Sequence, residues 1–233
     1  MEFNIMIPIL IVAAFAGTAI MIFAKRKSQA KAEDIHALAQ SKGWRHDVTT
    51  DPSGYTRITQ ITSRTANWIV EERFGSNSGG GATDSTNRSL TWTDPDAGIP
   101  TGLAVMSLAM SDDKAANMER FLDTMGDGVM GQHMMKTFFG VVGDRASELD
   151  AVEATGAAGA ILATSDAHEA LLPIAFHEAL VSPHDAMPKG AMPTIIRSPE
   201  GLQLNLKDTV KSPEQLEAMV QLGETLSAAL KQA

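Results

Sequence analysis

The end of the chain decides the fold: residues 194–206 read TIIRSPEGLQLNL and residues 212–231 read SPEQLEAMVQLGETLSAALK. In the first segment, two short apolar runs flank Ser-Pro-Glu-Gly, which predicts a β-hairpin. In the second, Ser212 is the expected N-cap, Pro213 suits the first helical position and Gln215 can close a capping box. One face of this helix is apolar, through Leu216, Met219, Val220, Gly223, Leu226 and Leu230. Such a face needs a sheet to cover.

Short strand-like runs precede the hairpin, at 57–62, 66–74, 89–93, 103–110 and 159–164. Trp68 and Val70 share one face of their run, as Leu90 and Trp92 do of theirs. The run 103–110 is apolar on both sides, which is typical of a central strand. The glycine-rich segment 75–87 predicts a flexible hairpin loop. Successive strands followed by helices indicate an α+β domain, an antiparallel sheet covered by helices. Further helical patterns occupy 24–42, 113–125 and 166 to about 180.

The N-terminal segment is typical of a membrane anchor. Residues 5–24 are 20 residues without a charge, which as a helix span about 30 Å, the thickness of the hydrocarbon core. A secretory signal would carry positive charge before the apolar run, whereas here only Glu2 precedes it. A buried core helix of this length would carry a polar stripe. We therefore expect one N-terminal transmembrane helix ahead of the α+β domain.

A basic collar follows the apolar run: Lys25, Arg26, Lys27 and Lys31. Because cytoplasmic flanks carry the excess of cations, we expect the N-terminus outside and the main domain in the cytoplasm, at a bacterial inner membrane. We expect the four cations to contact anionic lipid headgroups. Ala13 and Gly17 form a small-xxx-small pair, which is weak evidence for pairing of two spans.

Charge and composition exclude several classes of protein. The chain has a net charge of −9, and residues 32–233 hold 15 basic and 27 acidic residues, a net charge of −12. An acidic domain of this kind should repel nucleic acid. Cysteine is absent, which excludes disulfides, thiolate metal sites and cysteine nucleophiles. Aromatic residues make up only 5%, few for a surface that stacks bases or sugars.

The layout of these parts resembles a known group of proteins. The helix after the collar ends in Leu38-Ala39-Gln40-Ser41-Lys42-Gly43-Trp44, and the chain closes with a strand hairpin and an amphipathic helix. This order is similar to that of a broad group of uncharacterised bacterial single-pass membrane proteins. The resemblance implies an N-terminal span, a basic collar and a strand-rich α+β domain. It implies no catalytic residues, because the group has no agreed activity.

Two motifs in the middle of the chain suggest chemistry. Residues 126–131 match G-x-G-x-x-G, but a helical pattern precedes them where the dinucleotide motif needs a strand, so a helix end and turn is the preferred interpretation. The second motif is a cluster that contains Met125, Met130, His133, Met134 and Met135. Thioether and imidazole ligands suit Cu(I), although methionine more often fills cores and interfaces.

No other catalytic pattern emerges. The six histidines show no metal-ligand spacing, and neither a G-x-S-x-G elbow nor a P-loop is present. Trp68 and Trp92 are expected in the core under the last helix, with a partly open groove for a partner segment as the alternative.

These observations favour a membrane-anchored cytoplasmic protein-interaction module or accessory subunit of a membrane complex. An enzyme that acts on a membrane-bound substrate through unplaced carboxylates and a copper-handling protein are the alternatives. We expect an anchor at 1–27, a juxtamembrane helix at 28–43 and a soluble acidic α+β domain at 44–233. We predict no catalytic residue, cofactor or metal ligand, a protein partner of unknown identity, the lipid bilayer as partner through residues 5–24, and no nucleic acid.

Overall fold

The computed structural model describes residues 26, 29–52, 56–76, 86–107, 148–151, 161–167, 193–206, 210 and 212–231. The expected anchor at 5–24, the motif at 126–131, the Met/His cluster around residue 133 and the helix expected at 113–125 lie outside these residues. Within the described ranges, no helix is long and apolar enough to cross a membrane. The N-terminal span stays a prediction.

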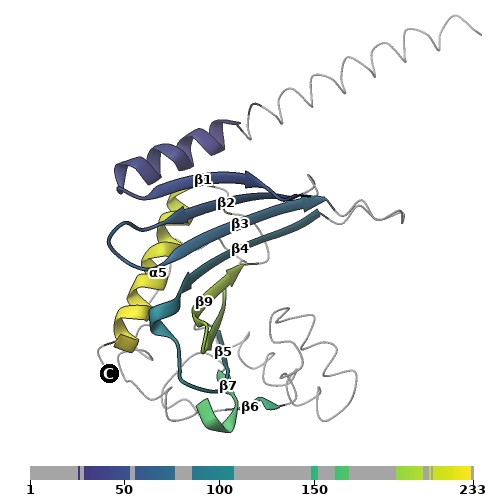
Figure 1. Ribbon diagram of the computed structural model, residues 1–233, viewed down its shortest axis with the longest axis vertical. Helices are drawn as coiled ribbons and strands as arrows, with labels where there is room; N and C mark the ends of the chain where they lie inside the picture. The colour runs from purple at the N-terminus through teal and green to yellow at the C-terminus, as the bar shows by residue number, and fades with distance from the viewer. Residues whose placement is uncertain are drawn as a thin grey trace, which may run out of the picture.

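The described strands form one antiparallel sheet of nine strands, in the order β1-β2-β3-β4-β9-β8-β5-β7-β6 (Figure 1). Their bounds are β1 Arg45–Thr50, β2 Thr56–Thr62, β3 Ile69–Ser76, β4 Thr86–Asp94, β5 Ala104–Ser107, β6 Asp150–Ala151, β7 Ile161–Ala163, β8 Thr194–Ser198 and β9 Gly201–Leu206. The 3-10 helices η1 (Pro95–Ala97) and η3 (Ser165–Ala167) follow β4 and β7. Residues 29–41 form a helix ahead of β1, and α5 spans Pro213–Lys231.

The predicted α+β architecture with an antiparallel sheet is confirmed. The runs expected at 57–62, 66–74 and 89–93 correspond to β2, β3 and β4. The hairpin expected in 194–206 is β8 and β9, joined by a turn that ends in Gly201 with φ of 128°. That backbone conformation favours glycine. The run expected to be central is β5, which lies between β8 and β7 and is buried on both faces.

Strand β1 was not predicted from the sequence. Its residues, RHDVTT, mix charged and β-branched side chains and are exposed or half-buried, so they show no apolar alternation. The strand forms because the chain returns beside β2, with Val48 opposite Thr59. It is the first strand of the sheet and therefore an edge strand within the described part of the chain.

One face of the sheet carries the main core. Its largest side chains are fully buried: Trp68, Leu90, Trp92, Met106, Ile195, Leu202 and Leu204. Helix α5 crosses this face and packs on β4, β9 and η1, behind the strands in the view of Figure 1. The predicted apolar face of α5 is confirmed, since Leu216, Met219, Val220, Gly223, Leu226 and Leu230 are all buried.

The helix of residues 29–41 belongs to the same core. Ile35 is 4% exposed and a member of the main cluster, Leu38 packs against that cluster, and Ala39 is fully buried. Lys31 pairs with Glu72 of β3, and Lys42 pairs with Glu217 of α5. The boundary expected between a juxtamembrane helix and a domain beginning at residue 44 therefore cuts through one packed unit.

Candidate functional site

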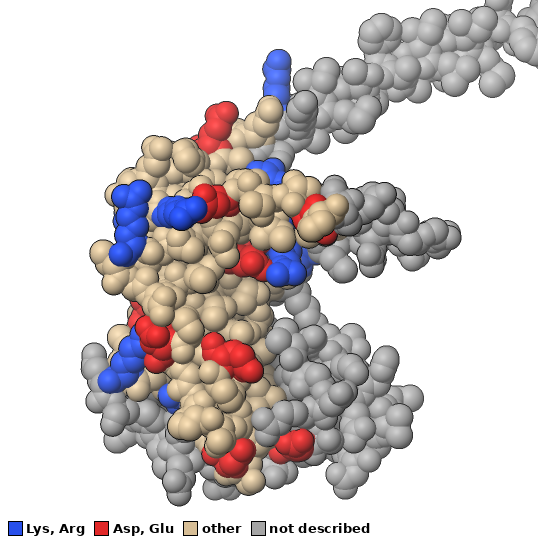
Figure 2. Space-filling view, viewed as in Figure 1, with Lys and Arg blue, Asp and Glu red and all other residues tan. Residues whose placement is uncertain are grey.

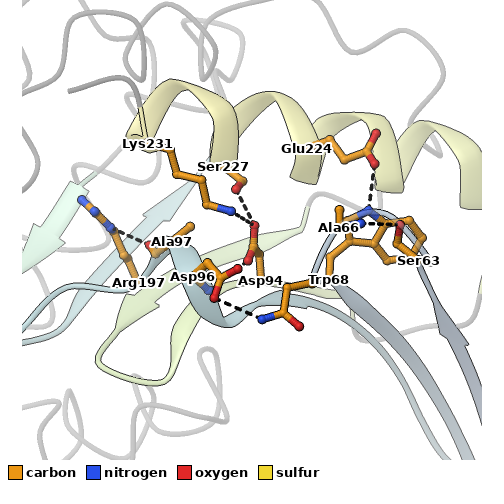
Figure 3. Close-up of polar contacts among 11 residues, drawn as sticks. Ser63, Ala66, Trp68, Asp94, Asp96, Ala97, Arg197, Glu224, Ser227 and Lys231 are labelled. Carbon is orange, nitrogen blue, oxygen red and sulfur yellow. Dashed lines mark hydrogen bonds and ion pairs between the residues drawn. The ribbon is translucent and has the colours of Figure 1, made fainter.

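Three polar side chains along α5 hold the helix on the sheet (Figure 3). Glu224 accepts a hydrogen bond of 2.7 Å from the indole Nε1 of Trp68. Ser227 and Lys231 both donate to Oδ2 of Asp94, at 2.5 and 2.8 Å. Positions 224, 227 and 231 share one stripe of a helix. This stripe lies beside the apolar face and fixes which side of α5 meets β4.

Asp94 is the most buried carboxylate of this group, at 4% exposure. Burial by itself raises the pKa of Asp94, but the hydrogen bonds from Lys231, Ser227 and the backbone N–H of Asp96 outweigh it and lower the pKa below the ordinary value. The carboxylate is therefore ionised at neutral pH. All its partners are structural groups of α5 and η1, so the arrangement fastens a helix and has no open side for a substrate.

The neighbouring Arg197 of β8 has a comparable structural role. Its Nε and Nη2 donate to the carbonyl oxygens of Ala97 and Gly98, at 3.0 and 3.1 Å. Burial lowers the pKa of Arg197 from its ordinary value. The guanidinium thus ties η1 to the β8–β9 hairpin.

The two tryptophans singled out in the sequence are buried beneath α5. Trp68 is 1% exposed and Trp92 is fully buried. Trp68 also meets the ring of Trp44 edge-on, with centroids 5.2 Å apart. Their positions agree with the expected core role. In this arrangement neither indole is accessible to a partner segment, so the alternative of a partly open groove at these residues finds no support.

The collar cations expected at lipid headgroups are placed only in part. Arg26 is helical and exposed, whereas Lys25 and Lys27 lie outside the described residues. Lys31 turns toward the sheet and pairs with Glu72 at 3.2 Å, with a side chain that is 29% exposed. The last cation of the collar thus has a protein partner as well as an expected lipid one.

Two histidines meet between the helix of residues 29–41 and β1. The Nδ1 atoms of His36 and His46 are 3.1 Å apart, and Gln40 approaches Nε2 of His36 at 2.9 Å. Burial, followed by the charge of His36, lowers the pKa of His46. In this contact one nitrogen must donate and the other accept, and the tautomers of the two rings decide which. In the described ranges, no group of three or more His, Cys, Asp or Glu side chains is arranged to hold a metal.

The other side of the sheet is accessible over β1–β4 and β9. We call the side chains there the open face, and all of them are exposed or half-buried: Arg45, Asp47, Thr49, Ile58, Gln60, Thr62, Ile69, Glu71, Arg73, Ser89, Thr91, Thr93, Gln203 and Asn205. The same side is buried farther along the sheet, where Leu103, Val105 and Ile196 form a second apolar cluster. The open face is therefore a bounded surface.

The open face is rich in uncharged hydrogen-bonding groups. Its charged residues form two local pairs, Arg45 with Asp47 at 2.6 Å and Arg73 with Glu71 at 2.5 Å. Figure 2, viewed from the side opposite α5, accordingly shows acidic and basic side chains next to each other over the strands. Toward one end of this face, Ile69 is 37% exposed and lies opposite Thr62 on β2 and Thr93 on β4.

The sequence contains a signal for this surface. Threonine, glutamine and isoleucine alternate with core residues along β2, in TRITQIT, and β4 continues the pattern with threonines on either side of Trp92. The alternation assigns these side chains to the side away from the core. The stripe of Glu224, Ser227 and Lys231 was likewise visible at helical spacing. Their partners Trp68 and Asp94 were not, because only the tertiary fold brings them together.

Comparison with known proteins adds no relative. No protein-family profile, curated protein or solved structure matches this chain.

Proposed function

We propose that this chain is a single-pass, membrane-anchored protein-interaction module, an accessory subunit of a membrane complex at a bacterial inner membrane. The observation that carries the proposal is the open face, a surface of β1–β4 with β9 at its side, whose named side chains are all exposed or half-buried. On the opposite face, α5 and the helix of residues 29–41 cover the main core. A sheet that packs two helices on one side and leaves the other accessible has a surface available for a partner.

The chemistry of the open face indicates the kind of partner. Interfaces between proteins are about as polar as the rest of the surface and carry roughly one hydrogen bond per 100–200 Å². The threonines and amides supply donors and acceptors in rows across the strands, such as Gln60, Glu71, Thr91 and Asn205. Ile69 and Ile58 add apolar contact on either side of this polar row. The partner is therefore a protein surface of mixed polarity without a strong charge of one sign.

The anchor and its orientation are supported by the sequence. The uncharged run 5–24 is followed at once by three cations, so the positive-inside rule places the remaining chain in the cytoplasm. The helix of residues 29–41 begins five residues after that run and belongs to the packed unit. A partner in the same membrane complex would then meet a face held at a fixed distance from the bilayer.

Site-specific photo-cross-linking in the native membrane tests the proposed surface. A photoreactive amino acid replaces Ile69 on the open face, and a matched control replaces Val48, which is 47% exposed on the opposite side of the neighbouring strands. We expect one discrete adduct from position 69, identified by mass spectrometry, and none from position 48. Purification of the full chain in mild detergent should recover the same partner protein. Purification of the Thr91→Lys variant should not recover it.

Adducts from both positions, or from neither, would contradict the proposal that the open face binds a partner. Loss of the full chain from membranes after alkaline extraction would contradict the anchor, independently of the surface. The two parts of the proposed function therefore fail separately.

A further inference from the structure

An arginine–phenylalanine–arginine row crosses three strands on the face that α5 covers elsewhere. Phe74 of β3 lies opposite Arg57 of β2 and opposite Arg88 of β4. Phe74 is 42% exposed, and both arginines are exposed. The guanidinium carbon of Arg88 is 4.9 Å from the centroid of the Phe74 ring. We call these three side chains the Arg-Phe-Arg row.

The row lies at the end of the sheet where the helix of residues 29–41 begins. Glu72, which precedes Phe74 on the same face of β3, forms an ion pair with Lys31 near the start of that helix. Figure 1 shows the first residues of the helix at the end of the sheet where β3 finishes and β4 begins. The apolar run ends at Ala24, seven residues before Lys31. Even a fully extended chain of that length spans at most about 25 Å.

The charge of the row opposes that of the surrounding chain. Residues 32–233 carry a net charge of −12, yet two arginines flank one exposed ring here. Neither Arg57 nor Arg88 forms an ion pair with another described residue. Two cations beside an exposed aromatic ring match an anionic interface, where phosphates accept hydrogen bonds from guanidinium groups and an apolar ring is buried at the boundary between headgroups and acyl chains.

We propose that the Arg-Phe-Arg row docks on the anionic headgroup surface of the membrane that holds the N-terminal anchor. The inference rests on the proposed membrane anchoring, because the short connection to residues 5–24 is what keeps this end of the sheet near the lipid. Arg57 and Arg88 bind lipid phosphates, and Phe74 inserts between headgroups. Lys31, which is also expected to contact lipid, pairs with Glu72 and so joins the helix to the end of the sheet that carries the row. Docking fixes the angle at which the open face stands relative to the bilayer.

A single fluorescent probe on the full chain tests this docking, since the chain has no cysteine and one introduced thiol labels uniquely. Thr50→Cys places the probe beside the row, because Thr50 is exposed and opposite Arg57. Ala66→Cys places a control probe in the exposed connection between β2 and β3, at the other end of the sheet. The chain is reconstituted in vesicles of phosphatidylcholine with or without phosphatidylglycerol, both containing headgroup-nitroxide lipid as quencher.

We expect quenching at residue 50 in phosphatidylglycerol vesicles, weaker quenching in phosphatidylcholine alone or at high salt, and little at residue 66. Each cation near an anionic surface favours association by about fivefold. Replacing both arginines, Arg57→Gln with Arg88→Gln, should therefore reduce docking by roughly twenty-fold or more. The matched control, Arg45→Gln with Arg64→Gln, removes two exposed arginines elsewhere and should leave quenching unchanged.

Quenching at residue 50 that is independent of phosphatidylglycerol, or that survives Arg57→Gln with Arg88→Gln, would overturn the docking proposal. Absence of quenching in pure lipid vesicles would do the same, and would leave an acidic protein as the partner of the row. Flotation after alkaline extraction reports the anchor separately. If the chain resists extraction but shows no quenching, the anchor is supported and the docking is contradicted. If the chain is extracted but shows the expected quenching, only the docking is supported.

Discussion

Gly223 lies where α5 crosses the indole of Trp92, and the contact leaves no room for a side chain. A Cβ at this position would lie 2.5 Å from Cδ2 and 2.7 Å from Cζ2 of the ring. Alanine favours the helix by about 1 kcal/mol over glycine, but overpacking of a core costs about 1–3 kcal/mol or more. Since Trp92 is fully buried on a central part of the sheet, the ring has nowhere to move.

We therefore predict that Gly223→Ala lowers the free energy of unfolding by about 1–3 kcal/mol, despite the better helix propensity. Urea unfolding of the detergent-solubilised chain measures it. Ala228→Ser, which also adds one heavy atom but on the exposed side of α5, is the control and should be close to neutral. A stabilised Gly223→Ala variant would mean that α5 shifts easily over the sheet.

Because of Asp94, the free energy of unfolding should depend on pH in the acid range. Its pKa in the folded chain is lowered by Lys231, Ser227 and the N–H of Asp96 acting against burial. A carboxyl with a lowered folded-state pKa contributes stability that is complete above its unfolded pKa, near 4, and is lost as the pH falls through the folded value.

Asp94→Asn should cost about 1–3 kcal/mol at pH 7, because Lys231 loses its charged partner in a buried position. The difference between this variant and the wild type should shrink as the pH falls below about 4. Urea midpoints across the acid range measure both. The neighbouring Asp96→Asn, at an exposed position, should shift the midpoint little at any pH. A constant difference for Asp94→Asn would show that the carboxylate acts through packing alone.

At the level of elements, α5 was predicted almost completely from its sequence. Its first residue, its length and its apolar face were all visible, because helix signals depend on residues within a few turns of each other. The hydroxyl of Ser212 binds the Glu214 carboxylate and lowers the pKa of Glu214, and the backbone N–H of Leu216 donates to the Ser212 carbonyl oxygen at 3.3 Å. The helix therefore begins at Pro213 as expected.

Leu226 is fully buried in α5, so its truncation should lower the free energy of unfolding more than the loss of Ser212 before the helix. Leu226→Ala should lower stability by about 2–5 kcal/mol, the range for truncating a buried leucine. Ser212→Ala should cost only about 0.5–2 kcal/mol, as the loss of a helix start does. Denaturant midpoints of the two variants measure this order. Equal or inverted costs would mean that α5 is loosely attached and available to a partner.

Strands were predicted less evenly, for a physical reason. β2, β3 and β4 show period-2 apolar patterns because one of their faces is buried, whereas β1 buries almost nothing and its sequence carries no such pattern. The open face and the Arg-Phe-Arg row both depend on register, which pairs residues far apart in sequence such as Arg57 and Arg88 around Phe74. No local sequence pattern specifies the strand register, so these two surfaces could be identified only from the folded sheet.

At the scale of the whole molecule, the helix of residues 29–41 joins the expected anchor to the sheet and is part of its core. Ile35 packs in the main core, and Leu38 and Trp44 pack against it. Lys31 pairs with Glu72 and Lys42 pairs with Glu217. A helix attached at both ends and buried along one face would transmit the position of the proposed anchor to the sheet. A loosely tethered domain would instead hold its open face at any angle.

This attachment predicts that a chain of residues 28–233 is clearly more stable than one of residues 44–233. Removing the helix exposes the part of the main core that Ile35 and its neighbours cover. Burial of one isoleucine alone contributes about 1.5–3 kcal/mol to stability. We expect a loss of about 2–4 kcal/mol, with part of it reproduced by Ile35→Ala in the longer chain. Urea unfolding followed by circular dichroism compares the three proteins. Equal stability of both truncations would make the helix a mere spacer, and the sheet would then be free to turn relative to the membrane.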